Sequence, residues 1–167
     1  ERAYASLRAC NDYFATRLEE RRRRPGEDLI SALASAPELD EDDRIGLCAT
    51  LVAGGYETTT HVVGNGLWAL LRFPEQLARL RADPRLLPNA IDEVIRWDGP
   101  AFSVVRRAIT DQQLNGATVK AGDKLYCLLY SANRDPARFS EPDVFDVTRA
   151  DTAHVGFGHG IHFCLGA

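Results

Sequence analysis

The 167 residues are enough for one domain with a core, and a hydrophobic fraction of 45% is ordinary for a globular protein. The formal net charge of −4 gives no reason to expect nucleic acid as a partner. No apolar run approaches the ~20 residues that cross a bilayer, so we expect no membrane contact. The four cysteines are far apart and form no CxxC pair, which favours a reducing, cytoplasmic setting over a disulfide framework or a zinc site.

The first part of the chain predicts three helices. Apolar residues recur at three- and four-residue steps over 1–22, where Pro25-Gly26 ends the pattern, and a short helix is predicted over 28–35. A long helix then runs from a cap at Asp40 to Phe73-Pro74. Acidic residues fill its first turn, where the helix dipole favours negative charge.

The centre of this long helix has an unusual composition. Residues 53–60 read AGGYETTT, which places two glycines, a carboxylate and three β-branched hydroxyl residues inside a helix. Each interior glycine costs about 1 kcal/mol relative to alanine. Glycine pairs, and threonines that bond back to the preceding turn, also cause kinks. The segment therefore predicts either a kink that opens a groove on one face or a helix crossing that needs small residues.

Two shorter helices are predicted over about 75–82 and 86–97, and Gly99-Pro100 ends the second. In the second helix Glu93 and Arg96 stand three residues apart, so they share a face and can pair. Taken alone, this pair is better explained as a surface ion pair of little energetic weight.

The hydrophobic period then changes to that of strands, over 103–109, 114–119 and 125–130. Asn115-Gly116 is a two-residue hairpin turn signal. From about 133 to 156 the sequence predicts a loop, and so long a loop in a compact domain is normally functional. These elements predict a mainly α protein with a small antiparallel β-sheet (α+β).

Residues 157–166, which read FGHGIHFCLG, carry the strongest chemical signal. A thiolate on iron must be deprotonated and shielded, and glycines let the backbone approach a flat macrocycle and aim N–H groups at sulfur. Cys164 alone is also explained as an inert buried thiol, but the glycine spacing favours a haem ligand. The other residues that would line such a site are Phe157, Gly158, Gly160, His162 and Gly166.

Three strings carry a family resemblance. FGHGIHFCLG resembles the haem-binding loop of the cytochrome P450 family, whose pattern is FxxGxxxCxG. GGYETT resembles the family's distal-helix motif (A/G)Gx(D/E)T, and Glu93-Val94-Ile95-Arg96 matches its ExxR motif. All three occur in the family's order and separation. The resemblance covers 40–167, while 1–39 fit the two helices that precede the distal helix in soluble bacterial members.

The resemblance implies haem b (iron protoporphyrin IX) as cofactor, with Cys164 as the metal ligand on the proximal side. Arg106 and His162 would bind the haem propionates. The remaining cofactor-binding positions of the loop would be Phe157, Gly158 and Gly160.

On the distal side, the resemblance implies that Glu57 and Thr58 are the catalytic acid–alcohol pair, which suits a proton relay. Gly54 and Gly55 would form the oxygen-binding groove beside that pair. Residues 102–105 would border the substrate pocket, together with Leu51 and Val52.

Glu93 and Arg96 would be structural, tying their helix to the loop that precedes the haem site. The family often has an arginine or histidine just before the Phe145-Asp146 step, completing a network with these two residues. Here Val144 stands there, so the network is expected to be weaker or to be closed by another residue.

The resemblance implies a monooxygenase that inserts one atom of O2 into an apolar small molecule. Its electrons would come from a ferredoxin-type donor with its reductase. A peroxide-driven relative, a haem-binding sensor without turnover and a helical domain with a buried cysteine stay open as alternatives. The chain would be a single incomplete domain, 1–167, lacking an N-terminal portion and a C-terminal helix of the family, and inactive by itself.

Overall fold

The computed structural model describes residues 2–167, which form two compact units with a boundary between Glu57 and Thr58. The fold is mainly helical with short antiparallel strands, which confirms the predicted class. Among the described residues, none of the helices combines the length and the apolar character that crossing a membrane requires.

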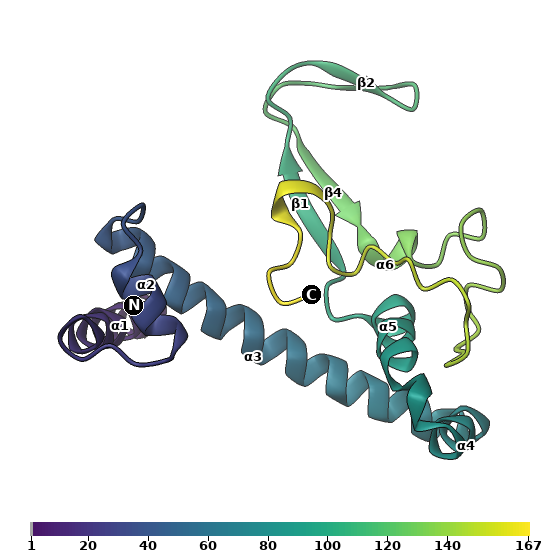
Figure 1. Cartoon of the computed structure of the whole chain (residues 1–167). Helices are drawn as coiled ribbons and strands as arrows, with labels where there is room; N and C mark the ends of the chain where they lie inside the picture. Colours follow the sequence, from purple (N-terminus) through teal and green to yellow (C-terminus); the bar gives the residue numbers. More distant parts are fainter. Residues whose placement is uncertain (1) are drawn as a thin grey trace. The chain divides into compact units, whose positions relative to one another are not determined.

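The first unit contains α1 (Arg2–Arg23), α2 (Leu29–Ser35) and the beginning of α3 (Glu41–Arg72) (Figure 1). The predicted cap is present, because the amide of Asp43 donates to the Asp40 carboxylate at 2.8 Å. Asp28 caps α2 in the same way, accepting from the Ser31 amide at 2.8 Å. The core of this unit consists of Phe14, Leu18 and Cys48, packed by Cys10, Ile30, Leu33, Ala34, Ile45 and Ala49.

Helix α3 is continuous over its 32 residues, so the predicted kink does not break it at the glycine pair. The helical hydrogen-bond ladder outweighs the cost of the two glycines at this position. Few α3 residues are buried; in the second unit these are Gly66 and Ala69. A Cβ at Gly66 would lie 3.3 Å from Val94 Cγ2, which shows how closely α3 approaches α5 there.

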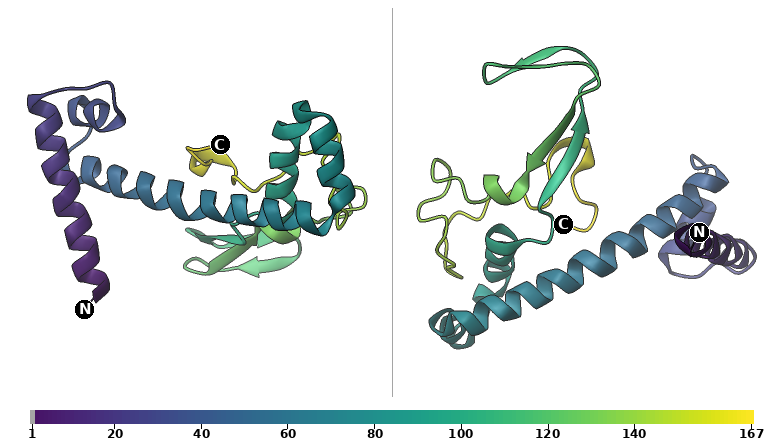
Figure 2. Two further views of the ribbon diagram at one scale, coloured as in Figure 1. Left: turned by 90° about the horizontal axis from the view of Figure 1, so that it is seen from below. Right: turned by 180° about the vertical axis from the view of Figure 1, so that it is seen from behind.

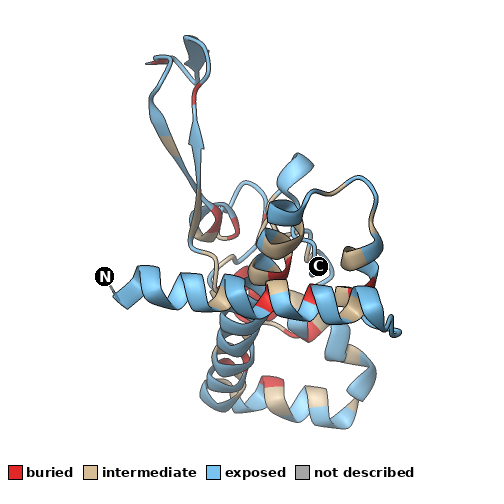
Figure 3. Cartoon of the chain, turned by 90° about the vertical axis from the view of Figure 1, so that its left-hand side faces the viewer, coloured by how far each residue is buried: buried red, intermediate tan, exposed pale blue. Residues whose placement is uncertain are grey.

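The core of the second unit lies between the end of α3 and the helices α4 (Pro74–Ala82) and α5 (Leu87–Asp98), joined by η1 (Pro84–Leu86) (Figure 2). Trp97 is at its centre, with ring centroids 5.6 Å from both Phe73 and Phe145. Figure 3 shows how small the buried part is relative to the exposed helices. The fully or nearly buried members of this core are Ala69, Ala90, Val94, Trp97, Phe145 and Val147.

The strands form two separate antiparallel pairs rather than one sheet. Strand β1 (Ser103–Arg107) pairs with β4 (Lys124–Leu128), and β2 (Gln112–Leu114) pairs with β3 (Ala117–Val119). The turn between β2 and β3 is the predicted Asn115-Gly116 turn, with φ values of 47° and 82° that match the two left-handed positions of a type I′ turn.

Two predicted strands end early: the one expected over 103–109 ends at Arg107, and the one expected over 125–130 ends at Leu128. Residues 129 and 130 were expected to continue the strand from 125, but they begin the short helix α6 (Leu129–Ala132). The amide of Tyr130 donates to the Phe102 carbonyl at 3.2 Å, and their rings stack at 5.9 Å. This tertiary contact accompanies the turn of the chain into α6, whose first residue, Leu129, is buried. The long loop predicted after α6 is confirmed, and it leads to a single 3-10 turn, η2 (Gly160–His162).

Candidate functional site

The backbone of the cysteine loop, residues 157–166, is held by its own hydrogen bonds. The amide of Cys164 donates to the Phe157 carbonyl at 2.9 Å, and the amide of Phe163 donates to Gly160 at 2.9 Å. Gly158 and Gly160 have φ values of 75° and 77°, a region that residues with a Cβ rarely adopt. The loop therefore needs glycine at both positions to adopt the backbone conformation in which the Cys164 amide reaches the Phe157 carbonyl.

The Cys164 side chain is a free, exposed thiol. A Cβ added at Gly166 would lie 3.9 Å from its sulfur, so the backbone passes close to Sγ. Apolar side chains of the same loop are also exposed, by 98% for Ile161, 55% for Phe163 and 81% for Leu165. An available thiol among exposed apolar side chains and close backbone fits a flat, apolar, iron-bearing group such as haem.

Aromatic rings lie at the base of this loop. The Phe157 ring is half-buried and meets the Phe163 ring edge-on, with centroids 6.3 Å apart. On its other side the His154 ring lies at 5.5 Å. Phe157 is therefore packed between Phe163, inside the loop, and His154, which precedes the loop.

The two predicted propionate ligands come from different elements. Arg106 lies on β1, opposite Leu125 of β4, and its guanidinium is exposed, donating only to the neighbouring Val105 carbonyl at 3.0 Å among the interactions of the described residues. His162 ends η2 and is exposed as well. Both side chains are thus accessible to an anionic ligand.

The predicted distal residues lie on consecutive turns of α3. Gly54, Gly55, Glu57 and Thr58 are all exposed, with the boundary between the two units falling between Glu57 and Thr58. A Cβ added at either glycine would meet nothing within 4 Å. The helix surface at these glycines is therefore open, as a groove for a small ligand requires.

Glu93 and Arg96 form a completely buried pair, with both side chains 0% exposed. Arg96 donates to both carboxylate oxygens, through Nε at 2.6 Å and Nη2 at 2.8 Å. It also donates to the carbonyls of Asn133, Pro142 and Val144, at 2.8, 2.9 and 3.2 Å. The explanation of this pair as a surface ion pair is therefore wrong.

Arg149 is the residue that sequence reasoning missed. Its Nε donates to Glu93 at 3.1 Å, and its guanidinium also reaches the carbonyls of Ser140, Glu141 and Val144. The network expected to be weaker at Val144, or closed by another residue, is closed by Arg149. Val144 itself contributes its carbonyl, while its side chain is half-exposed. No local pattern points to Arg149, because its partner lies 56 residues earlier in the chain.

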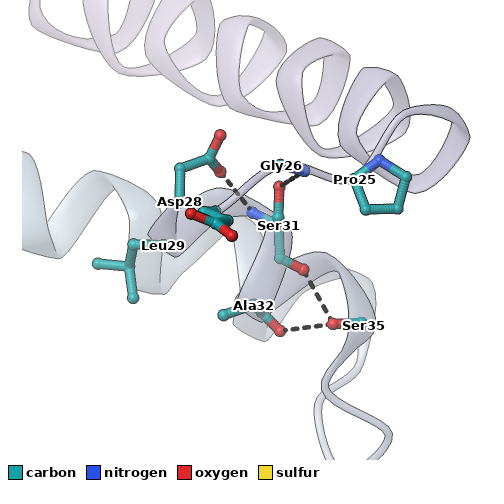
Figure 4. Close-up of a pocket in the computed structure, with 8 residues that line it drawn as sticks. Pro25, Gly26, Asp28, Leu29, Ser31, Ala32 and Ser35 are labelled. Atoms are coloured by element: carbon teal, nitrogen blue, oxygen red, sulfur yellow. Dashed lines mark hydrogen bonds between the residues drawn. The ribbon is translucent and has the colours of Figure 1, made fainter.

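The first unit contains an open hollow beside the start of α2, shown in Figure 4. Ser31 lies at its centre, where its hydroxyl accepts from the Gly26 amide at 2.9 Å and its own amide donates to Asp28. These bonds belong to the cap of α2. None of the residues predicted to bind haem or oxygen lines this hollow.

Comparison with protein families matches residues 7–167 to "Cytochrome P450", so the chain belongs to the cytochrome P450 family. The chain is 40% identical over 158 residues to the "Biotin biosynthesis cytochrome P450" of Bacillus subtilis (strain 168), covering 93% of this chain. It is 38% identical over 171 residues to the "Cytochrome P450 monooxygenase PikC" of Streptomyces venezuelae, covering 99% of this chain.

Solved structures agree with this assignment. The crystal structure of CYP109E1 from Bacillus megaterium in complex with testosterone matches 99% of this chain, with a TM-score of 0.95 and 36% identity. The chain spans 47% of that structure, and 40% and 41% of the two relatives above. It thus spans about two fifths of the length of the curated relatives that it matches.

Proposed function

We propose that the protein is a haem-dependent monooxygenase that inserts one oxygen atom from O2 into an apolar small molecule. The observation that carries this proposal is the cysteine loop, in which left-handed glycines and the amide of Cys164 present a free thiol at the surface. Membership of the cytochrome P450 family supports the same reaction class.

The side chains that would hold haem b are those of the cysteine loop and of β1. Cys164 would bind the iron as a thiolate, and the cationic side chains of Arg106 and His162 suit the propionates. Phe157, Gly158 and Gly160 would shape the loop around the sulfur. When bound, haem with a thiolate ligand supplies O2 activation, in which one oxygen atom enters the substrate and the other leaves as water.

Glu57 and Thr58 would supply protons to the oxygen site. A hydroxyl can orient a water molecule and a solvent-linked carboxylate can replenish its proton, which together deliver protons without flooding the site. The exposure of both side chains supports the link to solvent. Gly54 and Gly55 would leave room on α3 for the oxygen molecule.

Glu93, Arg96 and Arg149 would act as the scaffold of the cysteine loop rather than in chemistry. Their hydrogen bonds end on backbone carbonyls of the loop between 133 and 144, which precedes the cysteine loop in the chain. A buried network of this kind holds a loop in one conformation when all its members are satisfied.

Electrons would come from a ferredoxin-type donor with its reductase. An apolar substrate is supported by the exposed side chains of Phe102 and Val105, the region proposed to border the pocket. A cytoplasmic setting is supported by the four free cysteines at 10, 48, 127 and 164.

The absorption spectrum of the reduced, carbon monoxide-bound protein tests the central assignment, because thiolate ligation strongly red-shifts the main haem band. We expect this shift in the whole protein and its loss in Cys164→Ala. Cys127→Ala is the matched control, because Cys127 is also an exposed free cysteine but lies on β4. A shift that survives Cys164→Ala would contradict the proposal.

The proton relay has a separate test. Thr58→Ala should lose turnover driven by O2 and an electron donor while keeping turnover driven by peroxide, which brings its own protons. Equal loss of both activities would argue against a relay, and retention of both would leave Thr58 without a role in oxygen activation.

A further inference from the structure

His154 is a buried ionisable residue to which the proposed reaction assigns no role. Only 5% of its side chain is exposed. It lies in the loop before Phe157, where its ring packs on the Phe157 ring with centroids 5.5 Å apart. A polar side chain at this depth normally makes a specific hydrogen bond, and His154 does so with the backbone two residues later.

The hydrogen bond of His154 indicates which of its ring nitrogens carries the proton. The amide of Gly156 donates to His154 Nδ1 at 3.1 Å, so Nδ1 acts as the acceptor. A histidine nitrogen accepts only when it carries no proton, so the imidazole is neutral, with its proton on Nε2. The bond would be lost if Nδ1 were protonated.

The segment that His154 organises is packed against α5. A Cβ at Gly156 would lie 2.5 Å from Ile95 Cγ2, so no other residue fits there without displacement. The preceding amide, of Val155, donates to the buried side chain of Asn133 at 2.8 Å. The Asn133 carbonyl in turn accepts from Arg96 at 2.8 Å. The segment 154–156 is thus held between α5 and the buried network.

This segment leads directly into the cysteine loop. The carbonyl of Val155 accepts from the Gly158 amide at 2.8 Å, and the carbonyl of Phe157 accepts from the Cys164 amide at 2.9 Å. The Phe157 ring rests on the His154 ring. His154 therefore contacts Phe157, whose carbonyl in turn accepts from the Cys164 amide.

We propose that His154 is a positioning residue for the cysteine loop: as a neutral acceptor for the Gly156 amide and a support for the Phe157 ring, it sets the position of Cys164. This inference rests on the proposed function only for the identity of the ligand that Cys164 binds. The positioning itself is a property of the described residues and is measurable without haem.

Burial, rather than the charged groups around it, favours the neutral form of His154. Burial lowers the pKa of His154, and the positive charge of Arg96 lowers it further. Asp92 on α5 opposes this by raising the pKa, but its carboxylate is 3.8 Å from Nε2 and half-exposed. The neutral acceptor, rather than an ion pair with Asp92, is therefore the form that holds the loop.

The test is amide hydrogen exchange of Gly156 and Cys164 in the whole protein, measured with and without haem. His154→Leu removes the acceptor, and we expect both amides to exchange at least about tenfold faster, because each loses a restraint on local opening. His154→Asn supplies an acceptor oxygen in place of Nδ1, and we expect it to keep both rates within about threefold of the parent. Asp92→Asn should leave both rates unchanged.

Val147→Ala controls for a general loss of stability, because Val147 is fully buried in the core but is not part of this segment. If Val147→Ala accelerates the Cys164 amide as much as His154→Leu does, or if His154→Leu leaves that amide unchanged, His154 has no positioning role. Faster exchange in Asp92→Asn would assign the role to the ion pair instead. If His154→Leu does not fold, the nitrogen chemical shifts of His154 in the parent decide, since a protonated Nδ1 contradicts the proposal.

The same variants separate this inference from the proposed function. With haem bound, His154→Leu should reduce the red-shifted fraction of the carbon monoxide complex, and His154→Asn should restore it. Suppose that the parent protein lacks the red-shifted band, but that the amides of Gly156 and Cys164 exchange in the variants as expected. The haem assignment then fails, while the positioning role of His154 stands.

Discussion

The buried pair Glu93–Arg96 and the exposed cysteine loop use polar groups in opposite ways. The pair is 0% exposed, and its hydrogen bonds are made inside the protein, with Arg149 and with loop carbonyls. In the loop, the backbone bonds are also internal, but the thiol of Cys164 and the side chain of His162 face outward. Groups that fix a structure are satisfied internally, whereas groups proposed to bind a cofactor stay available to it.

Arg96→Leu should have the largest effect, because it removes one member of the buried pair. The change leaves the Glu93 carboxylate buried with one of its two cations removed, and we expect the free energy of unfolding to fall by about 3–5 kcal/mol. Urea unfolding followed by circular dichroism measures the loss. Arg85→Leu is the matched control, because Arg85 pairs with Asp83 at the surface and should leave the unfolding midpoint unchanged. A small effect of Arg96→Leu would mean that the buried pair does not stabilise the fold.

Arg149→Met should have the next largest effect. Glu93 keeps Arg96 as its partner, but the carbonyls of Ser140 and Glu141 lose their donor, so we expect a loss of about 1–3 kcal/mol in the same assay. Adding Val144→Arg should not restore stability, because the Val144 side chain is half-exposed and only its carbonyl joins the network. Full restoration would show that a basic residue at 144 can replace Arg149.

In the exposed cysteine loop, the other member of the comparison, Gly158→Ala should strain the backbone. A residue with a Cβ at a φ of 75° costs about 1–2 kcal/mol. Gly64→Ala, inside α3 where a Cβ would meet nothing within 4 Å, should instead stabilise the protein by up to about 1 kcal/mol. Opposite signs of the two changes in thermal unfolding support this reading, and equal signs contradict it.

The smallest expected effect is the pH dependence that His154 adds. Burial lowers its pKa in the folded protein below the ordinary value of 6.5, so the folded state binds fewer protons than the unfolded state. The contribution of His154 to stability is therefore complete above pH 6.5 and falls as the pH drops below it. His154→Asn should remove this part of the pH profile of urea unfolding, and an unchanged profile would show that His154 does not titrate differently on folding.

Local signals predicted the elements well. The cap at Asp40, the stops at Pro25-Gly26 and Gly99-Pro100, and the Asn115-Gly116 turn act through neighbouring residues, and the structure has each of them in place. The predicted helix over 1–22 is found at Arg2–Arg23, and that over 75–82 at Pro74–Ala82. Such signals depend only on short stretches of chain, so the sequence suffices to predict them.

Features that depend on distant partners could not be predicted. Helix α6 replaces the end of a predicted strand because Tyr130 packs on Phe102, and Arg149 joins Glu93 across 56 residues. The glycine spacing of the cysteine loop predicted a close backbone turn, but not the contact between the rings of His154 and Phe157 at its start. Burial of an ionisable side chain is decided by the whole fold, and nothing in the residues next to His154 indicates it.

The placement of aromatic and thiol groups makes the two units separately observable. The chain has two tryptophans, Trp68 and Trp97, and their rings stack 6.0 Å apart in the second unit. Cys48, in contrast, is 3% exposed in the core of the first unit. Tryptophan fluorescence therefore follows opening of the second unit, and alkylation of Cys48 follows opening of the first. Comparing the two signals along one denaturation curve reveals whether the units unfold together or in sequence.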